Sequence, residues 1–597
     1  MARQDSLRSD LAIREAFQAS NDGDPALDEA SDGDDDEIEN DSGSEAHRDE
    51  EFRPDELGAP VELKVELAQV KEKFSQRKRL KGIPGTAEPD QGCRLVSAKA
   101  GPEWRAKASG ESRNPVSPCT SYLPAPIGEA RNVSTSIEAW SLFFSSAILE
   151  KIQNHTNEEI RRYRGSIHAD NASESTYMDV ELKELKAFIG LMYFAGLQKA
   201  VKTNLEELWS NEYGSTFYRA AMSLKRFQFL ARTLRFDDKT TRTHRSLEDK
   251  LAPIREIWED FLTNCSKYYN PGFLCTAGEQ LLSFRGQCPF KVQTSSERCG
   301  IKVFTLNDAR TFYMLAAEPY TAKVTANNAQ SKSSYYVKKL SRSIDGSWRN
   351  ITCTNGLTCL ELFDEMLENH SLTMLGVVRK SEAHIPENFS LPGALRSSIY
   401  AYDNAKTLLA YTLRRDKVVV LLSTYHRKEG IDEETGDPEM LTFYNSTKTG
   451  AAKFDEMCRE YTTARKSLRW PMRLWMGMLD QAGINATIIY NLNSANRISD
   501  RRGFLKSLIF SLVEPHLRAR LEIPYLHRDL RLSIQILLKI DLDPPVPKAH
   551  ERTRGRRRCL FCPRSRDRKV SVFCDNCQRA ICDDHKIISC LVCYTRA

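Results

Sequence analysis

Apolar residues recur every three or four positions over long stretches of this chain, which is the spacing of amphipathic helices. Between about residues 134 and 265 the spacing returns in four segments, Ile137–Ile152, Leu182–Met192, Leu224–Leu234 and Ile254–Phe261. The pattern predicts a helical domain of roughly 130 residues, whose apolar stripes are core positions.

From about Phe273 the pattern changes to short β-branched and aromatic runs. Gly300–Asn307 and Thr311–Ala317 flank an Asp-Ala-Arg turn and predict a hairpin. Thr373–Val378 and Val418–Thr424 predict single strands. Helical runs alternate with them, at Leu360–Leu367 and Phe454–Tyr461. Strands mixed with helices predict an α/β core, interrupted by a polar insertion between Arg379 and Lys417. Long helical patterns return after Trp470.

The first 130 or so residues lack any recurring apolar pattern. Asp22–Glu56 holds seventeen acidic residues and two arginines, and a basic run and Gly, Pro and Ser-rich sequence follow. Such a segment cannot bury enough apolar surface to offset the entropy lost on ordering, so we expect disorder. The longest apolar run, Ala187–Leu197, has eleven residues and is too short to span a bilayer.

Charge divides unevenly along the chain. The net charge is +5 although the acidic N-terminal stretch carries a large negative excess, so the remaining sequence is strongly basic. A basic surplus of this kind favours a polyanionic partner.

Eight potential metal ligands lie within Cys559–Cys593, in pairs separated by two residues. The pairs are Cys559/Cys562, Cys574/Cys577, Cys582/His585 and Cys590/Cys593. This spacing lets both side chains of one tight turn reach a tetrahedral zinc ion, so eight ligands predict two structural Zn²⁺ sites without an open position. Spacing leaves open whether consecutive pairs share a zinc or alternate pairs do, as in a cross-brace.

Five motifs follow one another in the α/β region and beyond it. They are Glu279–Phe290 (EQLLSFRGQCPF), Gly300–Lys302, Arg349–Cys353 (RNITC), Tyr444–Lys448 (YNSTK) and Arg469–Met472 (RWPM). In this order they closely resemble piggyBac-type transposases, and the similarity runs from about residue 134 to the C-terminal cysteines.

The resemblance implies an RNase H-like core with an insertion domain, embedded in an α-helical dimerisation and DNA-binding domain and followed by a two-zinc cross-brace module. The expected boundaries are a disordered acidic region 1–130, helical parts 131–265 and 459–540, core parts 266–372 and 434–458, an insertion domain 373–433, a linker 541–553 and the zinc module 554–597.

In that family three aspartates hold two divalent metal ions for phosphodiester chemistry. The matching positions here are Gly278, Thr354 and Ala452, while a fourth family acid matches Asp455. Glu279 and Asn355 are one residue out of register, and successive strand side chains face opposite sides of a sheet. We therefore expect no functional Mg²⁺ site and no transposase catalysis.

The zinc module begins with a basic edge made of Arg554, Arg556, Arg557, Arg558, Arg564, Arg566, Arg568 and Lys569. These cations suit the phosphates of double-stranded DNA, and the resemblance implies binding to sites like transposon terminal repeats. It also implies that Cys559, Cys562, Cys582 and His585 share one zinc and Cys574, Cys577, Cys590 and Cys593 the other.

Two functions remain open for the module, sequence-specific DNA binding or a protein-interaction adaptor without DNA specificity. The basic runs Arg554–Arg558 and Gln76–Lys81 are typical of nuclear import signals, so we expect a nuclear protein. The family resemblance further implies a homodimer.

Overall fold

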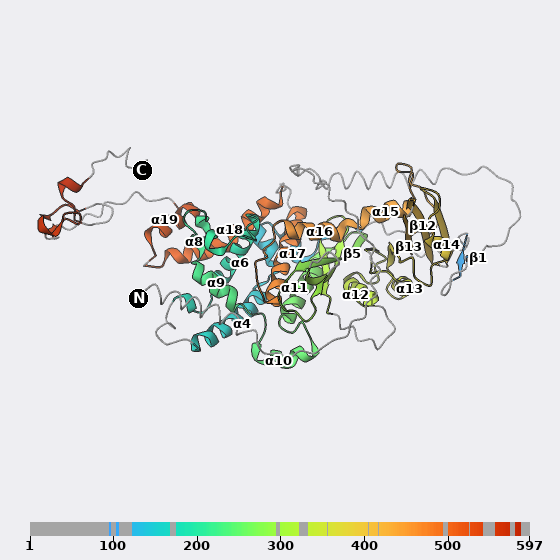
Figure 1. Cartoon of the computed structure of the whole chain (residues 1–597), viewed down its shortest axis with the longest axis horizontal. Helices are drawn as coiled ribbons and strands as arrows, with labels where there is room; N and C mark the ends of the chain where they lie inside the picture. Colours follow the sequence, from blue (N-terminus) through green and yellow to red (C-terminus); the bar gives the residue numbers. More distant parts are fainter. Residues whose placement is uncertain are drawn as a thin grey trace. The chain divides into compact units, whose positions relative to one another are not determined.

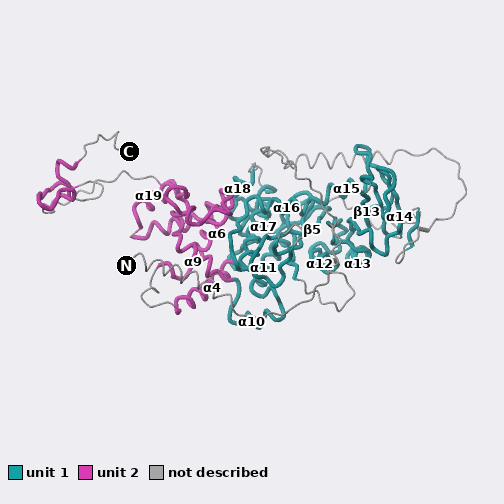
Figure 2. The backbone as a smooth tube through the Cα atoms, viewed as in Figure 1, with its two compact units in different colours: residues 1–148, 236–505 teal, residues 149–235, 506–597 magenta. Residues whose placement is uncertain are grey.

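The computed structural model describes residues 95–96, 103–106, 122–166, 175–293, 299–321, 332–354, 356–403, 405–415, 417–493, 500–524, 526–540, 556–566, 568–573 and 580–586. Contacts divide the chain into unit 1, residues 1–148 and 236–505, and unit 2, residues 149–235 and 506–597 (Figure 2). Among the described helices, none is both long and apolar enough to cross a membrane.

An eleven-stranded mixed sheet forms the centre of unit 1 (Figure 1). Its strands are β1 (Leu95–Val96), β2 (Trp104–Arg105), β5 (Leu274–Ser283), β6 (Val292–Gln293), β7 (Cys299–Asp308), β8 (Met314–Pro319), β9 (Asn350–Cys353), β10 (Thr373–Val377), β11 (Ser398–Asp403), β12 (Lys406–Arg414) and β13 (Lys417–Ser423). Their order is β1-β2-β11-β12-β13-β10-β9-β5-β7-β6, with β8 also paired to β7. β9 runs parallel to both β5 and β10, and the other pairs are antiparallel.

Unit 1 also contains helices, some of which pack on this sheet. They are α3 (Ser136–Ser141), α10 (Lys239–Glu248), α11 (Arg255–Lys267), α12 (Lys332–Ser341), α13 (Leu360–Glu368), α14 (Glu387–Ser390), α15 (Glu439–Thr447), α16 (Thr449–Glu460) and α17 (Trp470–Asn493). α16 packs on β5 and β7, α12 on β7 and β8, α13 on β10, and α17 on α3. A separate two-stranded sheet joins β3 (Ala125–Pro126) to β4 (Tyr269–Asn270).

The first predicted helical face is split in two. α3 begins with a capping box, in which Thr135 and Glu138 each bond the other's backbone N–H. The helix ends at Ser141, and α4 (Ser146–Gly165) starts after a four-residue break. Phe144 lies within the break, and its ring still stacks on Trp140 of α3, with ring centroids 5.2 Å apart. Periodicity therefore identified the buried positions but missed the break.

Unit 2 is helical in its first part. It contains most of α4 together with α6 (Leu182–Leu197), α7 (Leu205–Leu208), α8 (Thr216–Ala221), α9 (Leu224–Thr233), most of α18 (Arg501–Leu521) and α19 (Arg528–Leu537). α6 and α18 approach closely at Gly190, where an added Cβ would lie 2.5 Å from Val513 Cγ2. Any larger residue would force these helices apart.

A buried arginine connects α9 to α6 and the segment before it. Arg226 pairs with Glu184 at 2.7 Å, and its Nη1 donates to the backbone oxygens of Thr176 and Met178 at 2.8 and 2.7 Å. Charge and hydrogen bonds are thus both satisfied, as burial of a guanidinium requires.

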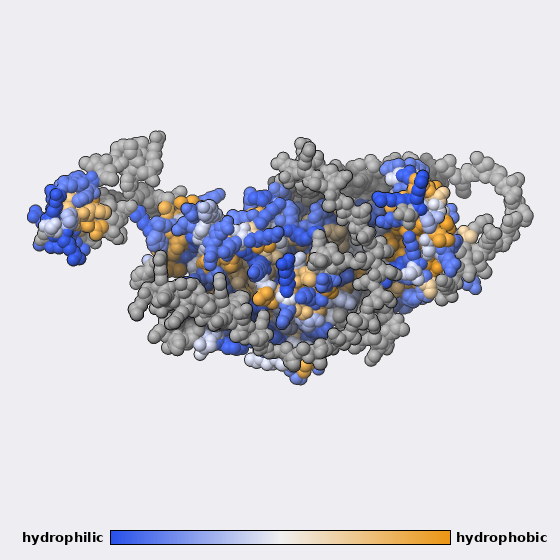
Figure 3. Space-filling view, viewed as in Figure 1, coloured by the Kyte–Doolittle hydropathy of each residue, from blue (hydrophilic) through white to orange (hydrophobic). Residues whose placement is uncertain are grey.

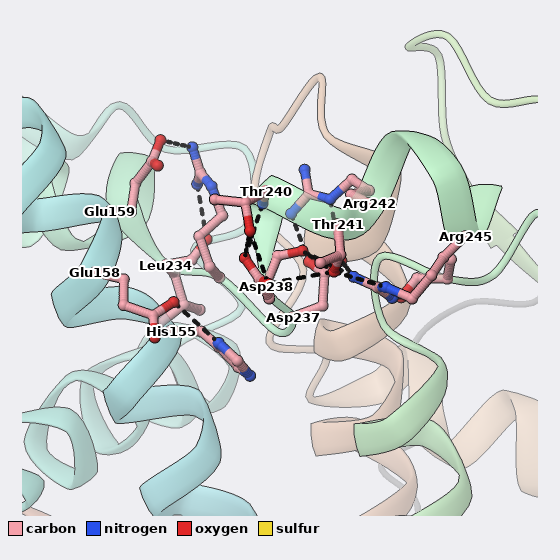
Figure 4. Close-up of polar contacts among 12 residues, drawn as sticks. His155, Glu158, Glu159, Leu234, Asp237, Asp238, Thr240, Thr241, Arg242 and Arg245 are labelled. Atoms are coloured by element: carbon pink, nitrogen blue, oxygen red, sulfur yellow. Dashed lines mark hydrogen bonds and ion pairs between the residues drawn. The ribbon is translucent and has the colours of Figure 1, made fainter.

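Polar contacts hold α10, which has no buried residue (Figure 4). Asp237 accepts from Arg242 Nε at 3.1 Å and from Arg245 Nη2 at 2.7 Å. Asp238 caps the helix by accepting from the Thr240 backbone N–H at 2.8 Å. The two arginines are therefore paired with an acid of their own unit.

Three expected boundaries differ from the structure. Disorder over residues 1–130 is wrong for the described parts of that range, since Trp104 is buried in the large sheet and Ala125–Pro126 pair with β4. The insertion cannot start at 373, because β10 (Thr373–Val377) pairs with β9 inside the core. The polar stretch between Arg379 and Lys417 contains β11 and β12, whose alternation the polar composition hid.

The expected helical domain also divides. α3, α11 and α17 belong to unit 1, where α17 packs on α3 and β5. The sequence suggested one helical domain because helical segments precede and follow the core along the chain. In the structure, the apolar faces of these helices pack on different elements.

Gly190→Ala should lower the free energy of unfolding by about 1–3 kcal/mol, because its Cβ has no room against α18. Gly165→Ala is the control, since no atom lies within 4 Å of its added Cβ, and it should leave stability unchanged or slightly raised. Urea unfolding followed by circular dichroism measures both, and equal stability of the two variants would contradict the close contact.

Candidate functional site

Gly278 and Thr354, two of the three positions predicted to correspond to the family's metal ligands, lie in β5 and directly after its neighbour β9. β5 and β9 run parallel, with Ala277 opposite Cys353. Thr354 follows β9, and its backbone N–H donates to the Ala277 oxygen at 3.0 Å. A Cβ at Gly278 would lie 3.6 Å from Thr354 Oγ1, so the two positions share one spot at the end of the parallel strands.

α16 brings the third element to the same spot. A Cβ added at Gly278 would come within 3.0 Å of the Ala451 Cβ, closer than real carbon atoms approach. Ala452, the next residue, is exposed on α16. The sheet therefore faces a helix that approaches through small side chains.

Threonine hydroxyls connect the junction between α15 and α16 to the strands through hydrogen bonds. Thr276 Oγ1 donates to the Thr447 backbone oxygen at 2.6 Å, and the hydroxyls of Thr352 and Thr447 lie 2.7 Å apart. These buried contacts fix where α16 begins. They thereby also fix the positions of Ala452 and Asp455 relative to the strands.

Asp455 is the remaining carboxylate at this centre. Its Oδ2 lies 3.2 Å from Arg459 Nε, while its Oδ1 is buried without a hydrogen-bond partner among the described residues. Burial raises its pKa, against the opposing effects of Arg459, Gln280 and Arg473. Thr354 Oγ1 is also a buried hydroxyl without a partner there.

The neighbouring acid Glu279 does not face this centre. Glu279 is exposed and pairs with Lys302, while the side chain positions of Thr276, Gly278 and Gln280 lie on the α16 and α17 side. Asn355 lies outside the described residues. One carboxylate and neutral groups do not match the oxygen donor set that two hard divalent cations need.

A buried carboxyl that sequence reasoning missed lies nearby on α17. Asp480 accepts from Thr462 Oγ1 at 2.6 Å and from the N–H and hydroxyl of Thr463 at 2.7 and 2.9 Å. Burial raises its pKa to about 6. These bonds tie the loop after α16 to α17, so its role is structural. The sequence did contain a signal for this buried carboxyl, because Asp480 is the single acid within the apolar run Leu474–Ile484.

The second candidate site lies in the C-terminal module, residues 554–597. Cys559, Cys562, Cys582 and His585 place their ligand atoms within 4.8 Å of one another, the sole group of this kind in the described parts of the chain. Cys562 Sγ is 3.7 Å from Cys582 Sγ, and His585 Nδ1 is 3.7 Å from the Sγ atoms of Cys559 and Cys562.

These spacings fit a metal ion. Two thiolates about 2.3 Å from one tetrahedral zinc are roughly 3.8 Å apart, close to the observed sulfur separation. Burial raises the pKa of the Cys559 thiol, yet backbone N–H donors from Cys582, Phe561 and Cys562 lower it to about 6, which favours the ligating thiolate. The cluster could therefore hold a metal ion.

Local pairing builds the cluster. β14 (Arg557–Arg558) and β15 (Lys569–Val570) form an antiparallel pair around the first ligand turn. Ile581 N–H donates to the Val572 oxygen and His585 N–H to the Cys582 oxygen, both at 3.0 Å, which aligns the second turn. The four ligands are those expected to share one zinc. The other expected set, Cys574, Cys577, Cys590 and Cys593, lies outside the described residues.

Basic side chains surround the strand pair. The described members of the predicted basic edge are all exposed, namely Arg556, Arg557, Arg558, Arg564, Arg566, Arg568 and Lys569. Arg568 pairs with Asp584, which makes it a weaker candidate for phosphate binding. Arg554 lies outside the described residues.

Known proteins share this architecture. The family model of transposase IS4 matches residues 135–487. A chain in the cryo-EM structure of a piggyBac transposase synaptic complex with hairpin DNA is similar with a TM-score of 0.70 and 34% sequence identity. The similarity covers 79% of this chain and 100% of that chain. A comparison with curated proteins gave no match.

Gly278→Asp should destabilise the chain by about 1–3 kcal/mol, because the new side chain meets Ala451 and places a carboxylate in a buried position. Adding Ala451→Gly should recover part of the loss. Ala452→Asp is the matched control, since it adds the same carboxylate at an exposed position and should change stability by less than about 0.5 kcal/mol. Thermal unfolding distinguishes these variants, and a fully stable Gly278→Asp protein would show that α16 is not close-packed on β5.

Proposed function

The chain belongs to the transposase IS4 family and is of the piggyBac type, and from that premise we propose that it binds DNA without cutting it. This proposal rests on the side chains at the three positions where the family has metal-binding aspartates. Gly278, Thr354 and Ala452 supply no carboxylate, and Asp455 alone cannot neutralise two divalent ions. Without bound divalent cations, the protein cannot cleave phosphodiester bonds by the two-metal mechanism.

We infer that the centre of unit 1 is an RNase H-like core. In support, β8, β7 and β5 form an antiparallel series that continues into the parallel strands β9 and β10, with α16 packed on β5. The inserted strands β11 to β13 follow β10 in the same sheet. The core retains its scaffold although the three acidic ligands are missing.

The C-terminal module is the proposed DNA-binding element. It binds two structural zinc ions, one through Cys559, Cys562, Cys582 and His585 and the other through Cys574, Cys577, Cys590 and Cys593. Arg558 and Lys569 lie opposite each other across the strand pair and share one face, while Arg557, opposite Val570, lies on the other face. Their exposure and charge suit contacts to DNA phosphates.

The matched solved chain is described as part of a complex with hairpin DNA, which supports a DNA ligand for this chain as well. Terminal-repeat-like sites, a homodimer and a nuclear location complete the proposal. They rest on the family and on the basic run Arg554–Arg558, a candidate import signal.

A protein-interaction adaptor is the second candidate. Leu560, Phe561 and Val572 are 51, 62 and 45% exposed on the same module. Figure 3 shows hydrophobic residues gathered on one side of it beside a largely hydrophilic surface. Exposed apolar residues on so small a module are typical of a protein contact.

The triple variant Arg557→Ala/Arg558→Ala/Lys569→Ala should weaken DNA binding by the full-length protein at least tenfold and reduce its salt dependence, because up to three phosphate contacts are lost. Lys586→Ala is the matched control on the same module, where Lys586 pairs with Asp583 at 2.7 Å, and it should bind like the parent. Fluorescence anisotropy over a salt series measures both. Chelation of the metal should abolish selectivity between DNA sequences, while unchanged DNA affinity in the triple variant would favour the adaptor.

No excision of a plasmid-borne pair of transposon ends is expected with Mg²⁺ or Mn²⁺, because the carboxylates that bind the two metal ions are replaced. Gel analysis of the plasmid products checks this. An authentic piggyBac-type transposase in the same assay is the positive control, and robust excision by this chain would refute the proposed loss of catalysis.

A further inference from the structure

A short N-terminal segment is built into the edge of the large sheet in unit 1. β1 pairs antiparallel with β2, with Val96 opposite Trp104. β2 in turn pairs antiparallel with β11, where Arg105 lies opposite Tyr402. Residues almost 300 positions apart in the sequence therefore share one sheet.

Trp104 anchors this segment. Its side chain is 0% exposed, and its Nε1–H donates to the His384 backbone oxygen at 2.9 Å. The residues on either side of it, Glu103 and Arg105, are both exposed. One indole is thus inserted into the sheet edge while its neighbours stay in solvent.

The edge to which the segment binds is suited to accept an extended peptide. β11 pairs with β12 along its whole length on one side. On its other side, among the described residues, β2 pairs with it at Tyr402. An edge strand presents backbone N–H and C=O groups that an added strand satisfies, and side-chain pockets then supply selectivity.

We propose that the β11 edge, together with the indole pocket closed by the His384 carbonyl, is a docking site for an extended peptide carrying a tryptophan. The chain's own strand β2 (Trp104–Arg105), paired with β1, occupies it in cis. The indole N–H and ring select the peptide, and the antiparallel backbone pairing orients it. This site uses neither the metal ligands nor the basic edge, so it is independent of the proposed DNA binding.

Detachment of the segment is compatible with the rest of the fold. Fifteen residues, 107–121, connect Ala106 to Tyr122, a chain length that can span up to about 50 Å. Tyr122 is held separately, with its ring 3.9 Å from the Arg349 guanidinium carbon. Release of Trp104 therefore leaves the next anchored residue in place.

The test uses the full-length chain with Trp104→Ala, which empties the pocket, and a fluorescent peptide that reproduces residues 93–108. The peptide should bind the variant and show at least tenfold weaker binding to the parent, whose site is filled in cis. A peptide with alanine in place of the tryptophan should lose at least tenfold in affinity for the variant. Leu123→Ala, which removes a 51% exposed leucine outside the segment, is the control and should behave like the parent.

Failure of the peptide to bind a folded Trp104→Ala chain would overturn the proposal, as would equal binding of the alanine peptide. Thermal unfolding followed by circular dichroism establishes whether the variant is folded, and DNA binding is measured separately, so this failure is distinguishable from failure of the proposed function. If the alanine variant does not fold, Trp104→Phe keeps an aromatic ring and removes the N–H donor. That variant should admit the peptide more readily than the parent, and exclusion equal to the parent's would contradict the role of the indole.

Discussion

The close approach of α16 to β5 is the constraint on which the centre of unit 1 depends. Gly278 and Ala451 leave no room for a side chain between strand and helix, and Thr276 bonds the junction where α16 begins. Close-packed interiors transmit such contacts to their neighbours, so the positions of Ala452, Asp455 and the loop after α16 follow from this one interface. The same contact leaves a tightly packed core at Gly278.

Under the proposed loss of the metal ligands, the small residues at this interface explain how the scaffold persists. Carboxylates gathered around metal ions repel one another when the ions are absent, whereas a glycine, a threonine and an alanine do not. The polar bonds that remain, from Thr352 to Thr447 and from Asp480 to Thr463, belong to the framework. The proposed loss of metal ligands and the retention of the fold are therefore physically compatible.

The C-terminal module follows a different principle. It is too small to bury a large apolar core, and its cluster of three thiols and an imidazole provides the centre instead. Exposed arginines on its strand pair and exposed apolar residues beside them give one small scaffold two kinds of surface. In the proposed function, the module still recognises DNA, whereas the core of unit 1 no longer catalyses its cleavage.

Local sequence determined the features that depend on near neighbours. Two-residue spacing identified the Cys559/Cys562 and Cys582/His585 turns. Periodicity identified the helical cores, β-branched runs identified several strands, and ordered motifs identified the family. Tertiary structure alone decided what distant segments do together: that Cys559 meets Cys582, that Trp104 fills a sheet edge closed by His384, and that Gly278 abuts Ala451. Spacing along a chain constrains a single turn or strand face, but the approach of two elements depends on packing volumes that no local pattern contains.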